Sequence, residues 1–164
     1  MTTTLRILRL LALAAWVGGL LFFVAVVARV AFSTLPDTHQ AGAIVRGTLL
    51  ELHKLGMICG AVYFFFTMIL LGMQRDTHPA RAVELALIVA MVSLTAYSQF
   101  SVMPSMERDR ISLGGEVKPD QADQPAYKHF QRLHKLSEKL EGAVLIEGLI
   151  LLALVPVHGD DDLY

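Results

Sequence analysis

The residues best suited to chemistry lie in the segment 134–141, where His134, Glu138 and Glu141 follow one another at spacings of four and three. Side chains separated by three or four residues lie on one face of an α-helix, so an imidazole and two carboxylates would point in one direction. One nitrogen and two carboxylate ligands suit zinc, iron or manganese. The spacing differs from the Glu-x-x-His motif of di-iron bundles, which weakens that analogy.

A second histidine, His53, lies in the shorter segment Glu51–Gly56, where another apolar stretch begins. Two histidines on separate helices of a bundle can ligate a haem iron from both sides. We therefore name His53 and His134 as candidate ligands of a b-type haem. Glu51 is a further candidate metal ligand, although two residues turn a helix by about 200° and so place it almost opposite His53.

The same residues have a simpler explanation as an ion-pair and packing network. Lys54, Lys135 and Lys139 are available to neutralise the acids, and the histidines would then be polar groups at a membrane interface. The pattern does not distinguish haem, a metal ion and this network. All three interpretations stay open at this point.

The composition indicates that these residues belong to an integral membrane protein. Of the 164 residues, 54% are hydrophobic and 18% are charged, and the mean hydropathy is +0.53. The apolar residues gather in stretches that reach the roughly 20 residues needed to cross a hydrocarbon core about 30 Å thick. The net charge of -1 gives no basic field for nucleic acid, and the single cysteine, Cys59, excludes an internal disulfide and a multi-cysteine zinc site.

The chain is predicted to be all-α, a single domain over residues 1–164 that forms a four-helix transmembrane bundle with up-down-up-down topology. The expected spans are 7–32, 47–72, 82–103 and 126–157, with a long connection at 104–125. The first apolar stretch exceeds the 7–15 residues of a signal-peptide core, so we expect it to be retained. Because the number of spans is even, the second and fourth helices begin on the same side, which places His53 and His134 at similar depth. Lysine and arginine counts place the first and third connections in the cytoplasm and the termini outside, in a bacterial inner membrane.

Glu147 lies about midway through the fourth expected span. An unpaired carboxylate at that depth is very unfavourable, so the group should be protonated or partnered. A contact within a homo-oligomer is the favoured explanation, and a proton-responsive pathway is the alternative.

Several segments resemble the DUF4149 (TMEM205-like) family of four-span membrane proteins. Residues 16–23, with the sequence WVGGLLFF, followed by Phe32 and Gly42, are similar to its first half, and residues 97–108 and 130–137 are similar to its second half. The family commonly has asparagine where this chain has Glu141. The resemblance implies a link to metal-drug resistance and a distant similarity to copper-resistance and haem-associated four-helix membrane proteins. It also implies a functional role for His134.

The sequence therefore predicts a protein that binds haem or a transition metal at the cytoplasmic edge of the bundle, with an electron-transfer or metal-handling role. The first alternative is a transporter or permeability protein for a small solute or metal drug, with Glu147 and the polar residues of 93–101 along its path. The second is a non-catalytic subunit of a larger membrane complex. An enzyme is less favoured, because the sequence contains neither a phosphate-binding glycine loop nor a nucleophile triad. The expected partners are membrane lipid and further copies of the chain.

Overall fold

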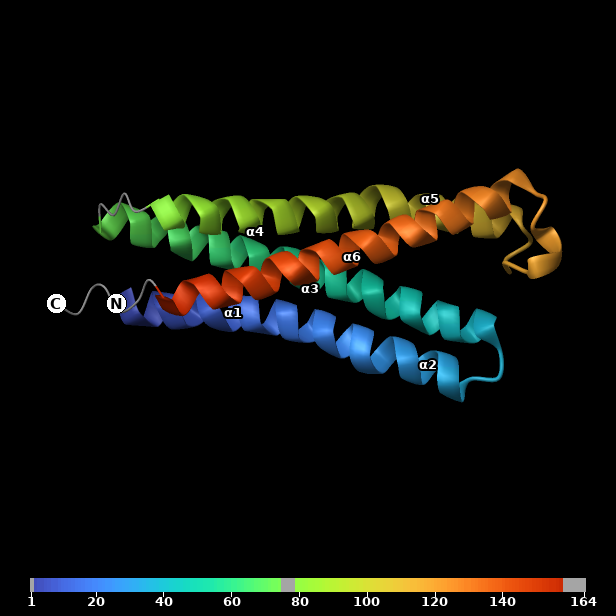
Figure 1. Ribbon diagram of the computed structural model, residues 1–164, viewed down its shortest axis with the longest axis horizontal. Coiled ribbons are helices and arrows are strands. Elements are labelled where there is room, and N and C mark those ends of the chain that lie inside the picture. The colour runs from blue at the N-terminus through green and yellow to red at the C-terminus, as the bar shows by residue number, and fades with distance from the viewer. Residues whose placement is uncertain (1, 75–78, 158–164) are drawn as a thin grey trace.

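The computed structural model describes residues 2–74 and 79–157, and every regular element within these ranges is helical (Figure 1). The elements are α1 (Thr2–Phe22), η1 (Phe23–Val27), α2 (Ala28–Thr34), α3 (Thr38–Gln74), α4 (Pro79–Tyr97), η2 (Ser98–Val102), α5 (Met103–Ser112), η3 (Pro119–Gln121) and α6 (Pro125–Val157). The π-helical turns η1 and η2 join α1 to α2 and α4 to α5 without a break. The all-α prediction is confirmed.

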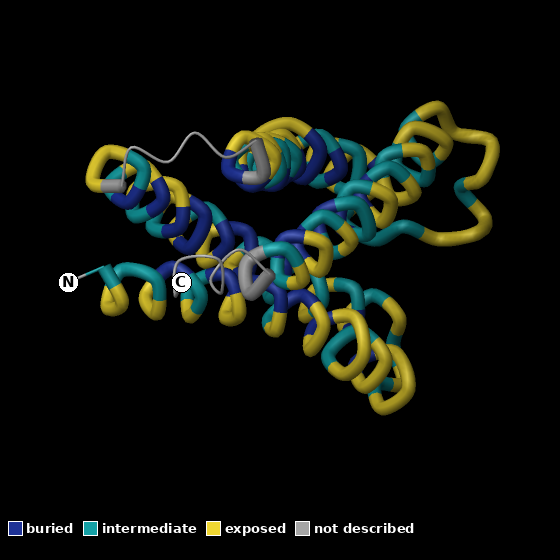
Figure 2. Tube along the Cα trace, turned by 60° about the vertical axis from the view of Figure 1, so that its left-hand side comes forward, coloured by how far each residue is buried: buried dark blue, intermediate teal, exposed yellow. Residues whose placement is uncertain are grey.

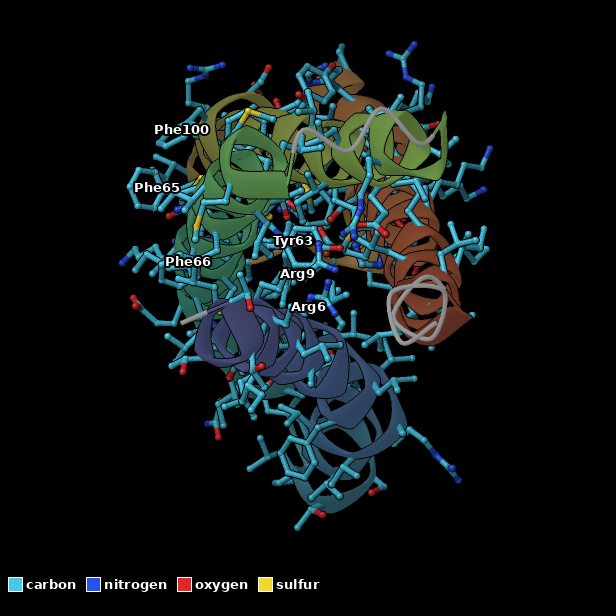
Figure 3. All side chains as sticks on the ribbon, turned by 90° about the vertical axis from the view of Figure 1, so that its left-hand side faces the viewer. Arg6, Arg9, Tyr63, Phe65, Phe66 and Phe100 are labelled. Carbon is cyan, nitrogen blue, oxygen red and sulfur yellow. The ribbon has the colours of Figure 1, made fainter. Side chains whose placement is uncertain are left out.

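Three helical segments are long and apolar enough to cross a membrane, namely Thr2–Thr34, Thr38–Met73 and Arg81–Ser112. Large apolar side chains are exposed on these segments: Figure 3 shows Phe65 and Phe100 pointing away from the other helices, with 61% and 69% of their surfaces exposed. Helix α6, the fourth expected span, does not meet the same criterion within its described residues. These three helices indicate an integral membrane protein.

The helix boundaries differ from the expected spans in two places. Helix α3 begins at Thr38 rather than near residue 47, and the Asp37 carboxylate accepts a hydrogen bond from the His39 backbone N–H at 2.9 Å, as a helix-capping residue does. The third helical segment continues to Ser112 although Pro104 was expected to end it. The wider π turn of η2 lies directly before Pro104, where a proline ring would otherwise clash with the carbonyl group of Phe100.

The connection predicted at 104–125 is consequently shorter. After α5 the chain turns at Gly114 and Gly115, whose φ angles of 86° and 92° lie in the left-handed region that favours glycine. The short helix η3 follows, and α6 begins at Pro125.

The core is built on the indole of Trp16, which is 1% exposed and packs against α3 at two glycines. A Cβ atom at Gly56 or Gly60 would collide with this indole, and at Gly60 it would also collide with Val92. At the next residue of α1, Gly148 of α6 leaves the space that Val17 and Met91 fill. Small residues thus bring α1, α3, α4 and α6 close together in the middle of the molecule.

Away from this closely packed middle region, the helices separate into two pairs. Figure 1 shows α2 and the first half of α3 diverging from α5 and the first half of α6, and Figure 2 shows the same separation from another side. Contacts join α2 to α3 and α5 to α6. Polar side chains from α3, α5 and α6 line a common space at this end of the molecule.

Candidate functional site

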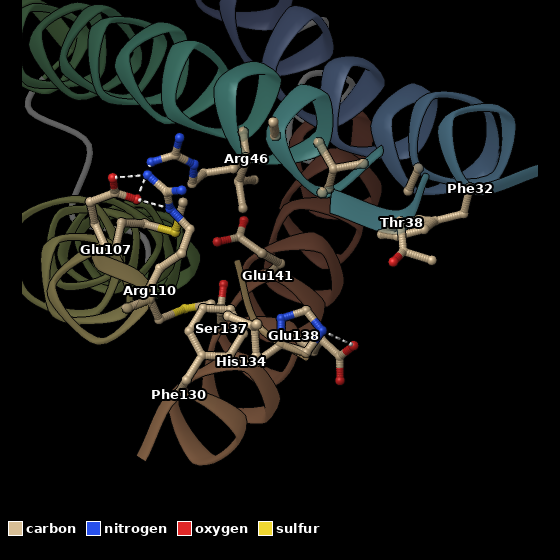
Figure 4. A pocket seen from close by; sticks show the side chains of 18 of the residues that line it. Phe32, Thr38, Arg46, Glu107, Arg110, Phe130, His134, Ser137, Glu138 and Glu141 are labelled. Carbon is tan, nitrogen blue, oxygen red and sulfur yellow. Dashed lines mark hydrogen bonds and ion pairs between the residues drawn. The ribbon is translucent and has the colours of Figure 1, made fainter. Parts of the chain in front are cut away.

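A cleft of about 690 Å³ lies between the two separated helix pairs (Figure 4). Its apolar wall comes mainly from η1 and α2, with Phe23, Val24 and Phe32, and continues through Leu49 of α3 and Met103 of α5. The polar side chains come from the other helices and share the same space: Arg46, Glu107, Arg110, Gln131, His134, Ser137, Glu138 and Glu141. The cleft is therefore amphipathic, with charge on one side and hydrocarbon on the other.

Two arginines hold one carboxylate at the polar side of this cleft. Arg46 of α3 forms a salt bridge to Glu107 of α5, which crosses between the helix pairs. Arg110 binds the same carboxylate in a bidentate manner, with Nε 2.9 Å from Oε2 and Nη2 2.6 Å from Oε1. A third bond of Arg110 reaches the backbone carbonyl of Gly115. The group carries two positive charges and one negative charge.

At its inner end the cleft meets a buried hydrogen-bonded cluster centred on His53, which is 1% exposed. Nε2 of His53 lies 2.7 Å from Oε1 of Glu141, and Nδ1 lies 3.0 Å from Oε1 of Gln99. Ser98 donates a hydrogen bond of 3.2 Å to the same Glu141 oxygen. Ser98 and Gln99 are consecutive residues of the π turn η2, whose smaller rotation per residue helps both of them reach α3 and α6.

The other candidate residues lie outside this cluster. His134 and Glu138 pair with each other at 3.4 Å, with 51% and 65% of their side chains exposed, and His134 stacks on Phe130. Glu51 bonds to Lys54 at 2.7 Å on the outer surface, with 73% of its side chain exposed. The structure thus joins Glu141 to His53 and leaves His134 and Glu138 at the rim.

The four predicted metal ligands, His134, Glu138, Glu141 and Glu51, do not form one group. In the part of the chain that the structure describes, no three His, Cys, Asp or Glu side chains are grouped closely enough to hold one. Both ring nitrogens of His53, the predicted haem ligand, have hydrogen-bond partners. An axial bond to iron would have to replace one of them.

A second buried charged cluster, which the sequence analysis overlooked, lies near the opposite ends of the helices. Nη1 of Arg9 lies 3.0 Å from Oε2 of Glu84, and Tyr63 donates a hydrogen bond of 3.3 Å to that oxygen. Arg9 also reaches Thr67 at 3.4 Å, while Arg81 lies 3.8 Å from Glu84. Figure 3 shows Arg9 and Tyr63 pointing into the space between the helices. The available signal was Glu84 itself, an ionisable residue within an apolar span.

Three atoms in the interior have no hydrogen-bond partner among the described residues: Oε1 of Glu84, Nε of Arg9 and Oε2 of Glu147. The oxygen of Glu147 is buried within the chain itself. It lies between the two clusters along α6, about 9 Å from the level of Glu141 at 1.5 Å per residue. Buried polar groups therefore occur at three levels of the helix assembly.

Comparison with known proteins gives one match. The sequence profile of a family described as "Domain of unknown function (DUF4149)" matches residues 11–110, which cover α1 through most of α5 and both π turns. No curated protein and no solved structure matches the chain. The match includes His53, Gln99, Arg46 and Glu107 but ends before α6, which carries Glu141.

Proposed function

The chain belongs to the DUF4149 family, and for this member we propose a membrane-embedded binding site for an amphipathic small molecule, with a role in its transfer or permeation. The observation that carries the proposal is the cleft between the separated helix pairs. Its volume of about 690 Å³ lies within the range of roughly 300–1,000 Å³ typical of small-molecule sites. Its polar and apolar walls would match the two parts of such a ligand.

The arrangement of the apolar and charged walls supports entry of the ligand from the bilayer. Phe23, Val24 and Phe32 belong to a helix that is apolar enough to lie in a membrane, and Val24 and Phe32 are half-exposed, so this wall would adjoin lipid when the helix spans the bilayer. Arg46 and Glu107 lie across the cleft from this wall (Figure 4). An amphiphile lying in the cleft would keep its apolar part toward the bilayer while its polar group met charged side chains.

This role is better supported than the haem or metal function expected from the sequence. A binding cleft uses the side chains in the positions that they occupy, whereas haem ligation requires His53 to lose a hydrogen bond. Only one of the expected ligands, Glu141, belongs to both the cleft lining and the buried cluster. In this proposal Glu141 forms the polar inner end of the binding site.

In the same proposal α6 crosses the membrane as a fourth helix and completes an up-down-up-down bundle. It packs against α1 and α4 along its second half. Within residues 142–154 the only charged residue is Glu147. The charged residues of α6 lie mainly in its first half, which begins beyond the bilayer if the helix spans it.

The proposal is tested by substitutions that fill the cleft with a large side chain without disturbing the packing of the helices. Gly42 and Gly142 both line the cleft, and a Cβ atom at either position would meet nothing within 4 Å. Gly42→Phe and Gly142→Phe would therefore fill the cleft. We expect native mass spectrometry of the full-length protein, offered lysophospholipids in detergent, to show one retained lipid and about tenfold weaker retention in each variant, equivalent to about 1.4 kcal/mol.

Gly47→Phe is the matched control, because Gly47 lies in α3, has the same open surroundings and does not line the cleft. This variant should retain lipid like the wild type. Equal retention by all three variants would mean that the lipid binds elsewhere, and the proposed function would then be wrong.

A further inference from the structure

We infer that the cleft selects an amphiphile with an anionic head group, a phosphate or carboxylate, which Arg46 and Arg110 bind by displacing Glu107. The inference rests on the proposed function and names the chemical class of its ligand. It follows from the charges on the polar wall and from the geometry of the guanidinium groups.

The arginine pair has one more positive charge than its protein partner neutralises. Arg46 and Arg110 both bind Glu107, and its two carboxylate oxygens are shared among three N–H groups. All three residues line the cleft. A bound anion would bring the number of negative charges to two, one for each guanidinium group.

The neighbouring acids do not supply that missing charge. Glu141 contacts His53 and Ser98 through its Oε1 atom and is held in the buried cluster by these two residues. Glu138 is mostly exposed and pairs with His134, so water screens it. His39 is the remaining titratable group of the lining and adds no negative charge. Glu107 is therefore the carboxylate that the structure places against both Arg46 and Arg110.

The geometry also selects the type of anion. Guanidinium groups present paired N–H donors that match the two oxygens of a carboxylate or phosphate, as Arg110 already does with Glu107. Arg46 and Arg110 approach from different helix pairs, so an oxyanion between them would replace the direct salt bridge across the cleft. Phe23 and Phe32 on the facing wall would receive the hydrocarbon part.

The experiment measures retention of anionic lysophosphatidylglycerol, zwitterionic lysophosphatidylcholine and inorganic phosphate by the full-length protein, each presented alone, using native mass spectrometry. We expect at least tenfold preference for the anionic lipid over the zwitterionic lipid, and no adduct with inorganic phosphate at the same concentration. Arg46→Gln and Arg110→Gln should abolish the preference. Arg108→Gln, an exposed arginine of α5 outside the cleft lining, should leave it unchanged.

Glu107→Gln provides the decisive comparison, because it breaks the same salt bridge as Arg46→Gln with the opposite effect on charge. Removing the competing carboxylate should strengthen retention of the anionic lipid severalfold. If Glu107→Gln and Arg46→Gln weaken retention equally, the bridge has only a structural role and the inference is wrong. Displacement of the lipid by equimolar inorganic phosphate would likewise overturn it, because the ligand would then be a free oxyanion.

Failure of this inference is distinguishable from failure of the proposed function. Equal retention of anionic and zwitterionic lipids, both lost in Gly42→Phe, would reject the anionic preference and leave the cleft as the binding site. Retention that is unaffected by Gly42→Phe would reject the cleft itself.

Discussion

Nε2 of His53 and Oε1 of Glu141 lie 2.7 Å apart and join α3 to α6 at the inner end of the cleft. Ser98 and Gln99 complete the cluster, so four side chains from three helical segments share one hydrogen-bonded group. A buried polar network of this kind is stabilising only while every member has its partners. Substituting one member of the cluster should therefore lower the unfolding free energy strongly. Substituting two interacting members together should cost less than the sum of the two single losses.

His53→Ala should destabilise the protein by about 3–5 kcal/mol, because it leaves the Glu141 carboxylate buried without its main partner. His53→Ala combined with Glu141→Gln should recover part of this loss, since the remaining amide carries no charge. The measurement is the unfolding free energy in mixed dodecyl maltoside and SDS micelles. Additive losses in the double variant would mean that the two residues do not interact.

His134→Ala is the matched comparison for this prediction. His134 is half-exposed and its pairing with Glu138 resembles a surface ion pair. Such pairs contribute about 0–1 kcal/mol, so the variant should remain close to the wild type. A loss of unfolding free energy as large as that of His53→Ala would show that the exposed His134–Glu138 pair stabilises the protein more than its exposure predicts.

The partners of the candidate site residues could not be predicted from the sequence. Helical spacing predicted that His134, Glu138 and Glu141 point in one direction, but spacing within a helix contains no information on which other helix faces it. Glu141 turns inward to His53, whereas His134 and Glu138 lie at the rim. The π turn at Ser98–Val102 also shifts the register of the third helical segment, which a regular period of 3.6 residues does not reproduce.

The second charged cluster was overlooked because its arginines have an ordinary explanation. Arginines near the ends of apolar stretches, such as Arg9 and Arg81, are ordinarily interfacial charges that set orientation, whereas here both are nearly fully buried beside Glu84. Glu84 lies three residues after Arg81, so a local ion pair was predictable from the sequence. The contact to Arg9 was not, because it depends on how α1 and α4 pack.

Glu84→Ala should be strongly destabilising for the same physical reason as His53→Ala. Arg9 would lose its 3.0 Å ion pair, and Arg81 would lose a nearby carboxylate in a buried position. We expect a loss of about 3–5 kcal/mol in unfolding free energy. Glu51→Ala, which removes an exposed carboxylate, should change it by less than about 1 kcal/mol. Equal effects of the two substitutions would contradict the buried placement of Glu84.

Gly60→Val should weaken the packing of α1 against α3. The added side chain would overlap the Trp16 ring and Val92, and overpacking of this kind typically destabilises by about 1–3 kcal/mol. Replacing Trp16 with Phe in the same protein should relieve part of the overlap. Gly47→Val controls for the change in helix propensity, because its surroundings are open. The comparison is again made on unfolding free energies, and equal losses at Gly47 and Gly60 would show that the overlap is not the cause.

The position of α6 makes a prediction about membrane topology. Its C-terminal half packs beside the N-terminal half of α1, so a spanning α6 returns the chain to the side on which α1 begins (Figure 1). In a Cys59→Ala protein, Thr3→Cys and a cysteine added after Tyr164 should react with a membrane-impermeant maleimide from the same side. Asp123→Cys, in the exposed connection before α6, should react only from the other side. Labelling of Asp123→Cys and the C-terminal cysteine from one common side would mean that α6 does not cross the bilayer.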